Sequence, residues 1–313
     1  MRNILLLFLV LILTGCDGER DASGPGGKLK VVATTTLVGD LVRQIAGDHV
    51  DLAVIMAAGV DPHTFKPSTQ DLGNVAAADL VFFNGLHLEG KMVDLFEEKL
   101  AKQSVAVTRD IPVDRLLGWS QGQSGAHDPH IWFDASLWRS AAQTVRDTLV
   151  ERDAKNASAY QAAHADLDAR LASLDAEMRS KLATVPEGKR VLITSHDAYN
   201  YFGKAYAVEV RGLQGISTET EAGLASINAA VDFILQRKIP AIFVESSVSH
   251  KSIERVQADV RARGFDVKIG GELYSDALGA AGEHAGFAVD TYEGMFRYNV
   301  ETIVRSLTAA SNP

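Results

Sequence analysis

The chain has 313 residues, a formal net charge of −9 and a single cysteine, Cys16. An acidic chain without a basic stripe or an arginine-rich segment has little to offer a phosphate backbone, so nucleic acid is excluded as an expected partner. One cysteine excludes an intrachain disulfide and a thiolate metal site. The length is sufficient for two lobes with separate cores.

The beginning of the sequence predicts a signal peptide over residues 1–15. A continuous apolar run from Ile4 to Leu13 is typical of a signal-peptide core and is too short to span a bilayer. The run ends in Leu13-Thr14-Gly15-Cys16, which resembles the lipobox of bacterial lipoproteins, whose cysteine becomes the lipidated first residue of the mature chain. An ordinary signal peptide with an incidental cysteine is the alternative. Residues 16–28 are polar and rich in glycine, and we expect them to form a flexible tether after the lipidated cysteine.

Strands and helices are expected to alternate in the N-terminal part of the chain, residues 29–155. Strands are expected at residues 28–36, 51–56, 80–84 and near 105, and helices at 37–46, after the N-cap Ser68 and at about 88–101. Because strands and helices take turns, the pattern favours a mostly parallel α/β sheet.

One long helix is expected next, over residues 156–184, where the sequence is rich in alanine and has neither glycine nor proline. Its apolar residues Leu167, Leu171, Leu174 and Met178 recur three or four positions apart and therefore share one stripe. At 1.5 Å per residue such a helix is roughly 40 Å long, about the width of a whole lobe.

A second series begins at residue 185 and continues to residue 313. Strands are expected at 190–195, 239–244 and 267–269, and helices at 197–206, 229–237, 252–263 and 292–307. The simplest architecture is an α/β fold of two lobes with parallel sheets, joined by the long helix. Two unrelated domains with a helical linker are the alternative. Ligands collect at the carboxyl ends of such strands and between lobes, so a site is expected in the interlobe cleft.

The tripeptide Asp-Pro-His occurs twice, ending at His63 and at His130. Proline stiffens each turn, so the following imidazole is largely positioned before anything binds. His196 directly follows a predicted strand and Asp276 follows the last one, and strand ends that face each other could bring all four side chains together. Three imidazoles and a carboxylate suit Zn²⁺ and are acceptable to Mn²⁺.

Other side chains are weaker candidates for this site. His87, His127 and His284 lie in less constrained loops, and Asp290 and Glu293 border the last helix, where acidic side chains favour the helix N-terminus. Glu245 and Asp134 could orient ligands from behind, although capping or a salt bridge would explain each of them equally well.

Several motifs in fixed order resemble the metal-specific solute-binding lipoproteins of ABC transporters, the ZnuA/TroA-like family. They are the segments 61–68, 128–134, 195–206, 212–221 and 273–278. The resemblance runs from about residue 29 to the C-terminus and implies two α/β lobes joined by a long rigid helix, with His63, His130, His196 and Asp276 as ligands. It also implies that one Zn²⁺ or Mn²⁺ ion is cargo, passed by a monomer in the periplasm or at the cell surface to a permease with an ATPase subunit.

Two departures bear on the metal. Relatives resembling zinc carriers commonly have a histidine- and acid-rich loop before the second ligand. The corresponding segment here, residues 116–126, is short and contains no histidine. Relatives resembling manganese carriers commonly have glutamate where this chain has His196. The third imidazole favours zinc as the tighter binder, while the missing loop leaves manganese open as the physiological cargo.

Enzymatic functions are the main alternatives. A secreted zinc hydrolase would keep an open metal position, but the chain has no His-Glu-x-x-His helix, and Asp197 is the one base beside a proposed ligand. A serine hydrolase built on Ser195-His196-Asp197 is less favoured still, because adjacent residues cannot face one another as a triad. We therefore expect a carrier and not an enzyme, with an adhesin-like surface lipoprotein as a further alternative.

Overall fold

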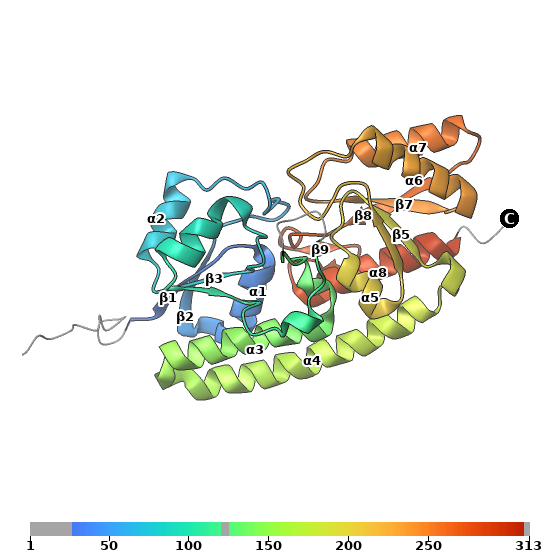
Figure 1. Cartoon of the computed structure of the whole chain (residues 1–313). Helices are drawn as coiled ribbons and strands as arrows, with labels where there is room; N and C mark the ends of the chain where they lie inside the picture. Colours follow the sequence, from blue (N-terminus) through green and yellow to red (C-terminus); the bar gives the residue numbers. More distant parts are fainter. Residues whose placement is uncertain (1–26, 120–124, 310–313) are drawn as a thin grey trace, which may run out of the picture.

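The computed structural model describes residues 27–119 and 125–309, in which two α/β lobes lie side by side along a long helix (Figure 1). Cys16 and the predicted signal peptide lie outside the described residues. No helix in the described ranges is both long enough and apolar enough to cross a membrane.

The first lobe contains a parallel four-stranded sheet in the order β2-β1-β3-β4. Its strands are β1 (Leu29–Ala33), β2 (Val50–Val54), β3 (Leu80–Phe83) and β4 (Ser104–Ala106), and its helices include α1 (Thr36–Ala46) and α2 (Thr69–Ala77). The central strand β3 is buried throughout, as expected for a strand covered on both faces. Ser68 caps α2 through a reciprocal capping box with Asp71, as the sequence predicted for its N-cap.

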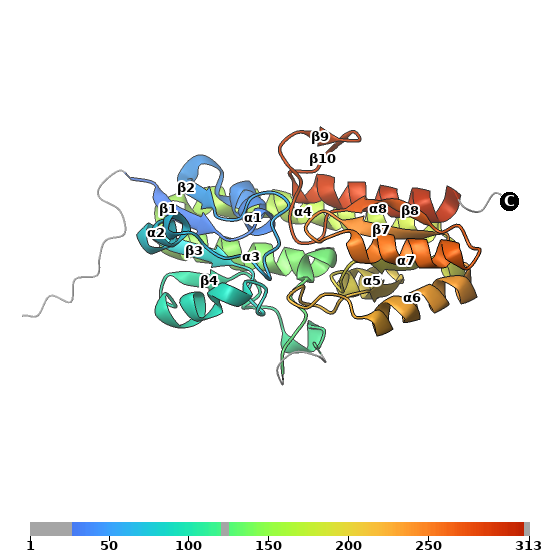
Figure 2. The same cartoon turned by 90° about the horizontal axis from the view of Figure 1, so that it is seen from above.

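The second lobe repeats the alternation. It contains β5 (Val191–Thr194), α5 (Asn200–Tyr206), β6 (Glu209–Gly212), α6 (Leu224–Arg237), β7 (Ala241–Glu245), α7 (Lys251–Ala262) and β8 (Lys268–Leu273). The pairs β5–β6 and β7–β8 are parallel, and β5 lies beside β7. A short antiparallel ribbon, β9 (Glu283–His284) and β10 (Phe287–Ala288), projects from the side of the molecule in Figure 2.

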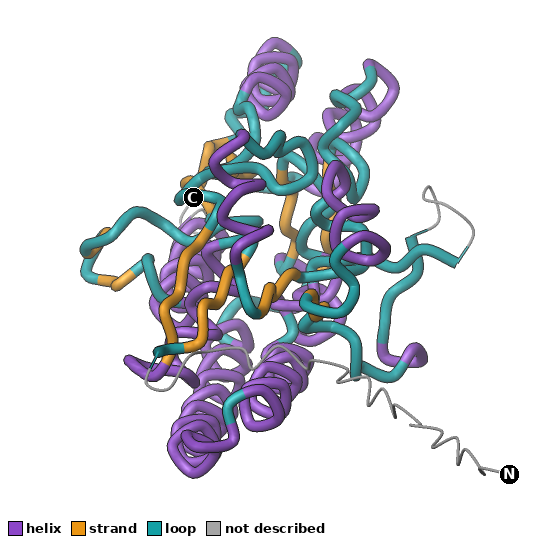
Figure 3. Tube along the Cα trace, turned by 90° about the vertical axis from the view of Figure 1, so that its left-hand side faces the viewer, coloured by secondary structure: helices purple, strands orange, loops and turns teal. Residues whose placement is uncertain are grey.

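Three long helices pack against the lobes: α3 (Ala135–Arg152), α4 (Ala157–Ala183) and α8 (Tyr292–Ala309). Helices α3 and α4 run side by side along the lower edge of the molecule, below the strands (Figures 1 and 3). The stripe predicted for α4 is confirmed, because Leu167, Leu171, Leu174 and Met178 are all buried. Helix α4 contacts α1 of the first lobe and α5 of the second, so it joins the two along its length.

The core continues from one lobe into the other through a cluster of aromatic rings. Phe133, just before α3, stacks on Tyr199 of the second lobe with ring centroids 4.2 Å apart. Phe296 of α8 lies 6.2 Å from the Phe133 ring and 5.6 Å from the Tyr292 ring. Burial of these large rings stabilises the junction and holds the facing strand ends at a fixed separation.

Two expected elements differ in extent or type. The helix expected at about residues 88–101 is present over residues 90–99, but it is irregular: a 3-10 turn, η2 (Gly90–Met92), leads into a short π-helix, η3 (Leu95–Lys99). It begins later than expected because glycine is a weak helix former and the Glu89 side chain accepts from backbone donors in the core. Strand β8 extends past the expected residues 267–269 and includes two glycines. Because glycine is uncommon inside strands, the residue pattern did not predict the strand beyond that point.

Candidate metal centre

Four side chains converge between the lobes, each from a loop beside a sheet or helix end. His63 comes from the loop after β2, His130 from the turn before α3, His196 from the loop after β5 and Asp276 from the loop after β8. One potential ligand atom from each residue lies within 4.8 Å of all the others. His63 is 3% exposed and the other three are fully buried. The structure thus brings together the four residues singled out from the sequence.

The Nε2 atoms of the three imidazoles face a common centre. His63 Nε2 lies 3.3 Å from His130 Nε2. The Asp276 carboxylate lies opposite, with Oδ1 3.5 Å from His130 Nε2 and Oδ2 3.4 Å from His196 Nε2. Within the described residues, His196 Nε2 and Asp276 Oδ1 are buried without a hydrogen-bond partner. Buried polar atoms left unpaired are costly, and a cation bound at the centre would remove that cost.

Two of the imidazoles have a carboxylate behind them. Asp128 Oδ1 lies 2.7 Å from His130 Nδ1, and Asn200 Nδ2 donates to the other Asp128 oxygen. Glu245 Oε2 lies 2.6 Å from His196 Nδ1, and Glu245 Oε1 accepts from the His196 backbone N–H. A carboxylate at Nδ1 keeps a proton on that nitrogen, so that Nε2 is the atom that faces a metal, and it makes the imidazole a more basic ligand.

The first Asp-Pro-His copy is built differently. Asp61 accepts from the His63 backbone N–H at 2.9 Å, as Asp128 does from His130 at 3.0 Å. Its other oxygen, however, accepts from the hydroxyls of Thr64 and of Thr218, which belongs to the second lobe. Asp61 therefore connects the lobes at the rim of the site, whereas Asp128 orients a ring.

Burial and charge shift the pKa values of the cluster in opposite directions. Burial lowers the pKa of His63 to about 3, and the neighbouring imidazoles act in the same direction, so His63 is neutral near pH 7. Burial also opposes a charge on His196, but the carboxylates of Glu245 and Asp276 outweigh it and hold the His196 pKa well above its ordinary value. Burial would raise the pKa of Asp276, yet the imidazoles lower it. An ionised carboxylate beside imidazoles is a donor set for a divalent cation.

The weaker candidates have other roles. Asp134 caps α3 by accepting from the backbone of Ser136 and Leu137, which is the capping alternative. His284 contacts the Tyr274 hydroxyl at 2.8 Å, and Glu293 pairs with Arg170. None of His87, His127, His284, Asp290 and Glu293 belongs to the four-residue cluster.

Sequence reasoning assigned no role to Asp128 or Asn200. The signal for Asp128 is present in the tripeptide itself, because an aspartate two residues before a histidine can turn back onto the backbone N–H of that histidine. The two copies look alike in sequence, so the pattern could not show that only one carboxylate reaches the ring. Asn200 meets Asp128 across 72 positions, a contact that only the folded structure reveals.

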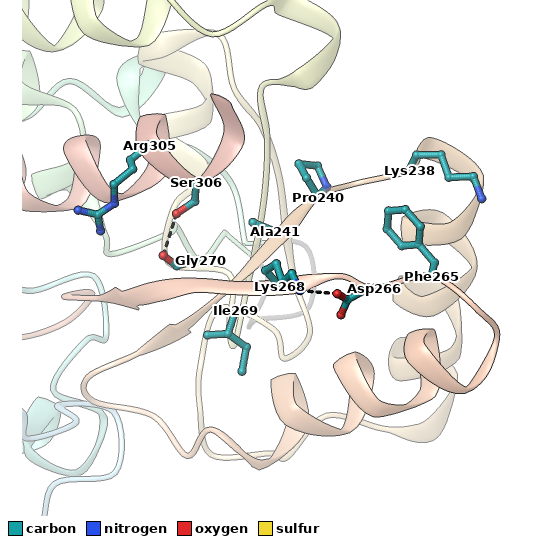
Figure 4. Close-up of a pocket in the computed structure, with 10 residues that line it drawn as sticks. All are labelled: Lys238, Pro240, Ala241, Phe265, Asp266, Lys268, Ile269, Gly270, Arg305 and Ser306. Carbon is teal, nitrogen blue, oxygen red and sulfur yellow. Dashed lines mark hydrogen bonds and ion pairs between the residues drawn. The ribbon is translucent and has the colours of Figure 1, made fainter. Parts of the chain in front are cut away.

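A cavity of about 720 Å³ lies elsewhere, along β8 of the second lobe (Figure 4). Its charged side chains include Lys268, which pairs with Asp266, and Lys238, whose ammonium lies 5.2 Å from the Phe265 ring centroid. Ser306 donates to the Gly270 carbonyl at 2.7 Å. The residues that line this cavity include no histidine and one carboxylate, Asp266, which pairs with Lys268, so they form no cluster of metal donors.

Comparison with known proteins agrees with the fold. The family model described as zinc-uptake complex component A, periplasmic, ZnuA, matches residues 31–306. The chain is 40% identical over 303 residues to the manganese-binding lipoprotein MntA of Bacillus subtilis, covering 96% of this chain and 97% of that protein. It is 41% identical over 309 residues to the zinc-binding protein TroA of Treponema pallidum, covering 97% and 96%.

A solved structure is similar over nearly the whole described fold. The periplasmic zinc-binding protein TroA from Treponema pallidum superposes with a TM-score of 0.84 at 41% identity, covering 90% of this chain and 99% of that one. Sequence and fold therefore agree over the same region. The chain belongs to the ZnuA family of periplasmic zinc-uptake components.

Proposed function

We propose that this protein captures one Zn²⁺ or Mn²⁺ ion outside the cytoplasm and delivers it to the permease of an ABC transporter for import. The observation that carries the proposal is the buried cluster of His63, His130, His196 and Asp276, assembled from loops of both lobes. Membership of the ZnuA family supports a transport role. Because the ion would be cargo, the site has to hold it tightly and still release it.

The donor set supports zinc as the tighter ligand. Three imidazole nitrogens and one carboxylate oxygen can complete a tetrahedral zinc shell, and divalent affinities generally rise from manganese to zinc. The names of the relatives do not decide the cargo, since MntA is named for manganese and TroA for zinc at 40% and 41% identity. Manganese stays open as the metal carried in the cell.

Location and partners complete the proposal. We infer that residues 1–15 are removed, that Cys16 carries the lipid and that residues 16–28 tether the two lobes to the membrane. The description of the B. subtilis relative as a lipoprotein supports this reading. A permease and its ATPase subunit would receive the metal from the monomeric carrier, in the periplasm or at the cell surface.

The geometry favours a carrier over a zinc hydrolase. Four protein donors surround the centre, whereas a catalytic zinc keeps a position for water. Asp197 is engaged elsewhere, because its carboxylate accepts from the Gly212 backbone N–H at 2.8 Å. The serine-hydrolase alternative fails as well, since the His196 ring contacts Glu245 and Asp276.

The test is a competitive titration of metal-free protein with Zn²⁺ and Mn²⁺ against a chelator of known affinity. The wild type should bind one equivalent, and His63→Ala should lose most of its affinity for both metals. His49→Ala is the matched control, because His49 is an exposed histidine of the same lobe outside the cluster. Equal affinities for the wild type and His63→Ala would remove the proposal.

A further inference from the structure

A buried carboxylate, Glu89, lies outside the metal cluster and is 1% exposed. Its Oε1 accepts from the Thr34 hydroxyl and the Asn84 backbone N–H, each at 2.7 Å. Its Oε2 accepts from the Gly85 backbone N–H at 3.3 Å. Thr34 directly follows β1 and Asn84 directly follows β3, so a single carboxylate ties together the ends of two adjacent strands.

The loop that Glu89 closes has an unusual backbone. Gly85, Leu86 and His87 have φ values of 85°, 54° and 63° in succession. Residues other than glycine occupy this left-handed region at a cost, and such conformations persist only where the surroundings impose them. Glu89 supplies part of that constraint, because it holds the backbone N–H groups at the start of the loop.

The same network reaches both Asp-Pro-His turns. Asn84 Nδ2 donates to the carbonyl of Pro129, the middle residue of the second turn, at 3.1 Å. On the other side, Gly90 lies next to the first turn, since a Cβ there would be in van der Waals contact with the His63 carbonyl oxygen at 3.4 Å. Glu89 is thus linked to both turns: to the first through the next residue, Gly90, and to Pro129 of the second through Asn84, from whose backbone N–H it accepts.

We propose that Glu89 is a positioning residue of the metal site, which sets the separation of His63 and His130 without binding the metal itself. The inference rests on the proposed function, because it concerns how well those two imidazoles meet one ion. Replacing a carboxylate oxygen of Glu89 with an NH₂ group would set a donor against a donor, at the Gly85 N–H or at the Asn84 N–H. The loop would shift, and the two turns would shift with it.

The experiment measures zinc affinity and the visible absorption of bound Co²⁺ in Glu89→Gln, with Glu98→Gln as the matched control. Glu98 is an exposed glutamate a few positions along the chain. Glu89→Gln should lower zinc affinity about 10- to 100-fold, the range for groups that support ligands from behind. It should also change the Co²⁺ bands, which report coordination geometry. A role in stability alone would lower the unfolding temperature and leave the Co²⁺ spectrum of the folded protein unchanged.

A second pair of variants keeps the inference testable if Glu89→Gln does not fold. Thr34→Val removes one hydroxyl donor to Glu89 with little change of volume, and Thr34→Ser retains the donor. We expect weaker zinc binding in the valine variant and wild-type binding in the serine variant.

The failure of this inference can be told apart from failure of the proposed function. If the wild type binds zinc, His63→Ala does not, and both Glu89→Gln and Thr34→Val match the wild type in affinity and spectrum, then the role of Glu89 is refuted while the site stands. If His63→Ala binds zinc like the wild type, the metal site itself is refuted, and the role of Glu89 with it.

Discussion

The two Asp-Pro-His turns offer an internal comparison of two aspartates with the same local geometry. Both accept from the backbone N–H of the histidine two residues later, but only Asp128 also lies at 2.7 Å from an imidazole Nδ1. We predict that Asp128→Asn weakens metal binding, because the amide retains an acceptor but loses the charge that polarises His130. Asp61→Asn should have a clearly smaller effect, since the Asp61 side chain contacts hydroxyls and no ring.

The size of the effect follows from the buried contact. A hydrogen bond to a charged group contributes about 1.5–3 kcal/mol and a neutral one about 0.5–1.5 kcal/mol, so the substitution removes about 1–1.5 kcal/mol. At about 1.4 kcal/mol for each factor of ten, zinc affinity should fall about tenfold. Asp128→Ala, which removes the acceptor as well, should approach the upper end of the range of about 10- to 100-fold for such partners.

The assay is chelator competition at fixed pH and ionic strength on the wild type and the three variants, with circular dichroism to verify folding. Equal losses in Asp128→Asn and Asp61→Asn would show that charge near the site matters and orientation of the ring does not. Wild-type affinity in Asp128→Ala would refute the reasoning outright.

Three further predictions concern the anchor, the long helix and a buried charge. Cys16→Ser should move the protein from the membrane to the soluble fraction of fractionated cells with its metal affinity unchanged; continued membrane association would exclude the lipid anchor. Leu174→Ala, at a fully buried position of α4, should lower the free energy of unfolding by roughly 2–5 kcal/mol, whereas Leu224→Ala, at a side chain 74% exposed, should change it little in urea titrations. Burial raises the pKa of Asp40, which accepts from the Tyr292 backbone N–H at the start of α8. The folded protein then holds this proton more tightly than the unfolded chain, so the stabilising contribution of Asp40 is fullest below its ordinary pKa of 3.8 and is lost as the pH rises through its raised value. The unfolding free energy of the Asp40→Asn variant minus that of the wild type should therefore increase as the pH rises through this range. A difference that does not change with pH would contradict the raised pKa of Asp40.

Much of the fold was predictable because its elements carry strong local patterns. The expected helix at residues 156–184 is observed at Ala157–Ala183, since a 27-residue run with one apolar stripe has few other ways to bury it. Helix α3 and strand β6 were not predicted. Alanine, serine and charged residues dominate α3, and β6 is a short strand with exposed charged residues, so packing against neighbours decides both structures. The boundaries drawn between signal peptide, tether, lobes and connecting helix stay predictions.

The candidate site was predictable in its members and less so in its construction. Histidines after stiff turns and strand ends were visible along the chain, and the structure brings three of them together with Asp276. Glu245 was one of two residues expected to orient ligands, and it lies against His196, whereas the other, Asp134, caps a helix. Contacts such as Asn84 with Pro129 span 45 positions and leave no periodic trace in the sequence.

The central claim is that four side chains from two lobes bind one metal ion. The most direct test is a crystal structure of the zinc-loaded protein with anomalous scattering measured at the zinc edge. We predict one peak, bonded to Nε2 of His63, His130 and His196 and to the carboxylate of Asp276, with zinc–nitrogen distances of about 2.0–2.1 Å. A peak bonded to other residues, or a zinc ion that leaves one of these four side chains unbound, would contradict the account.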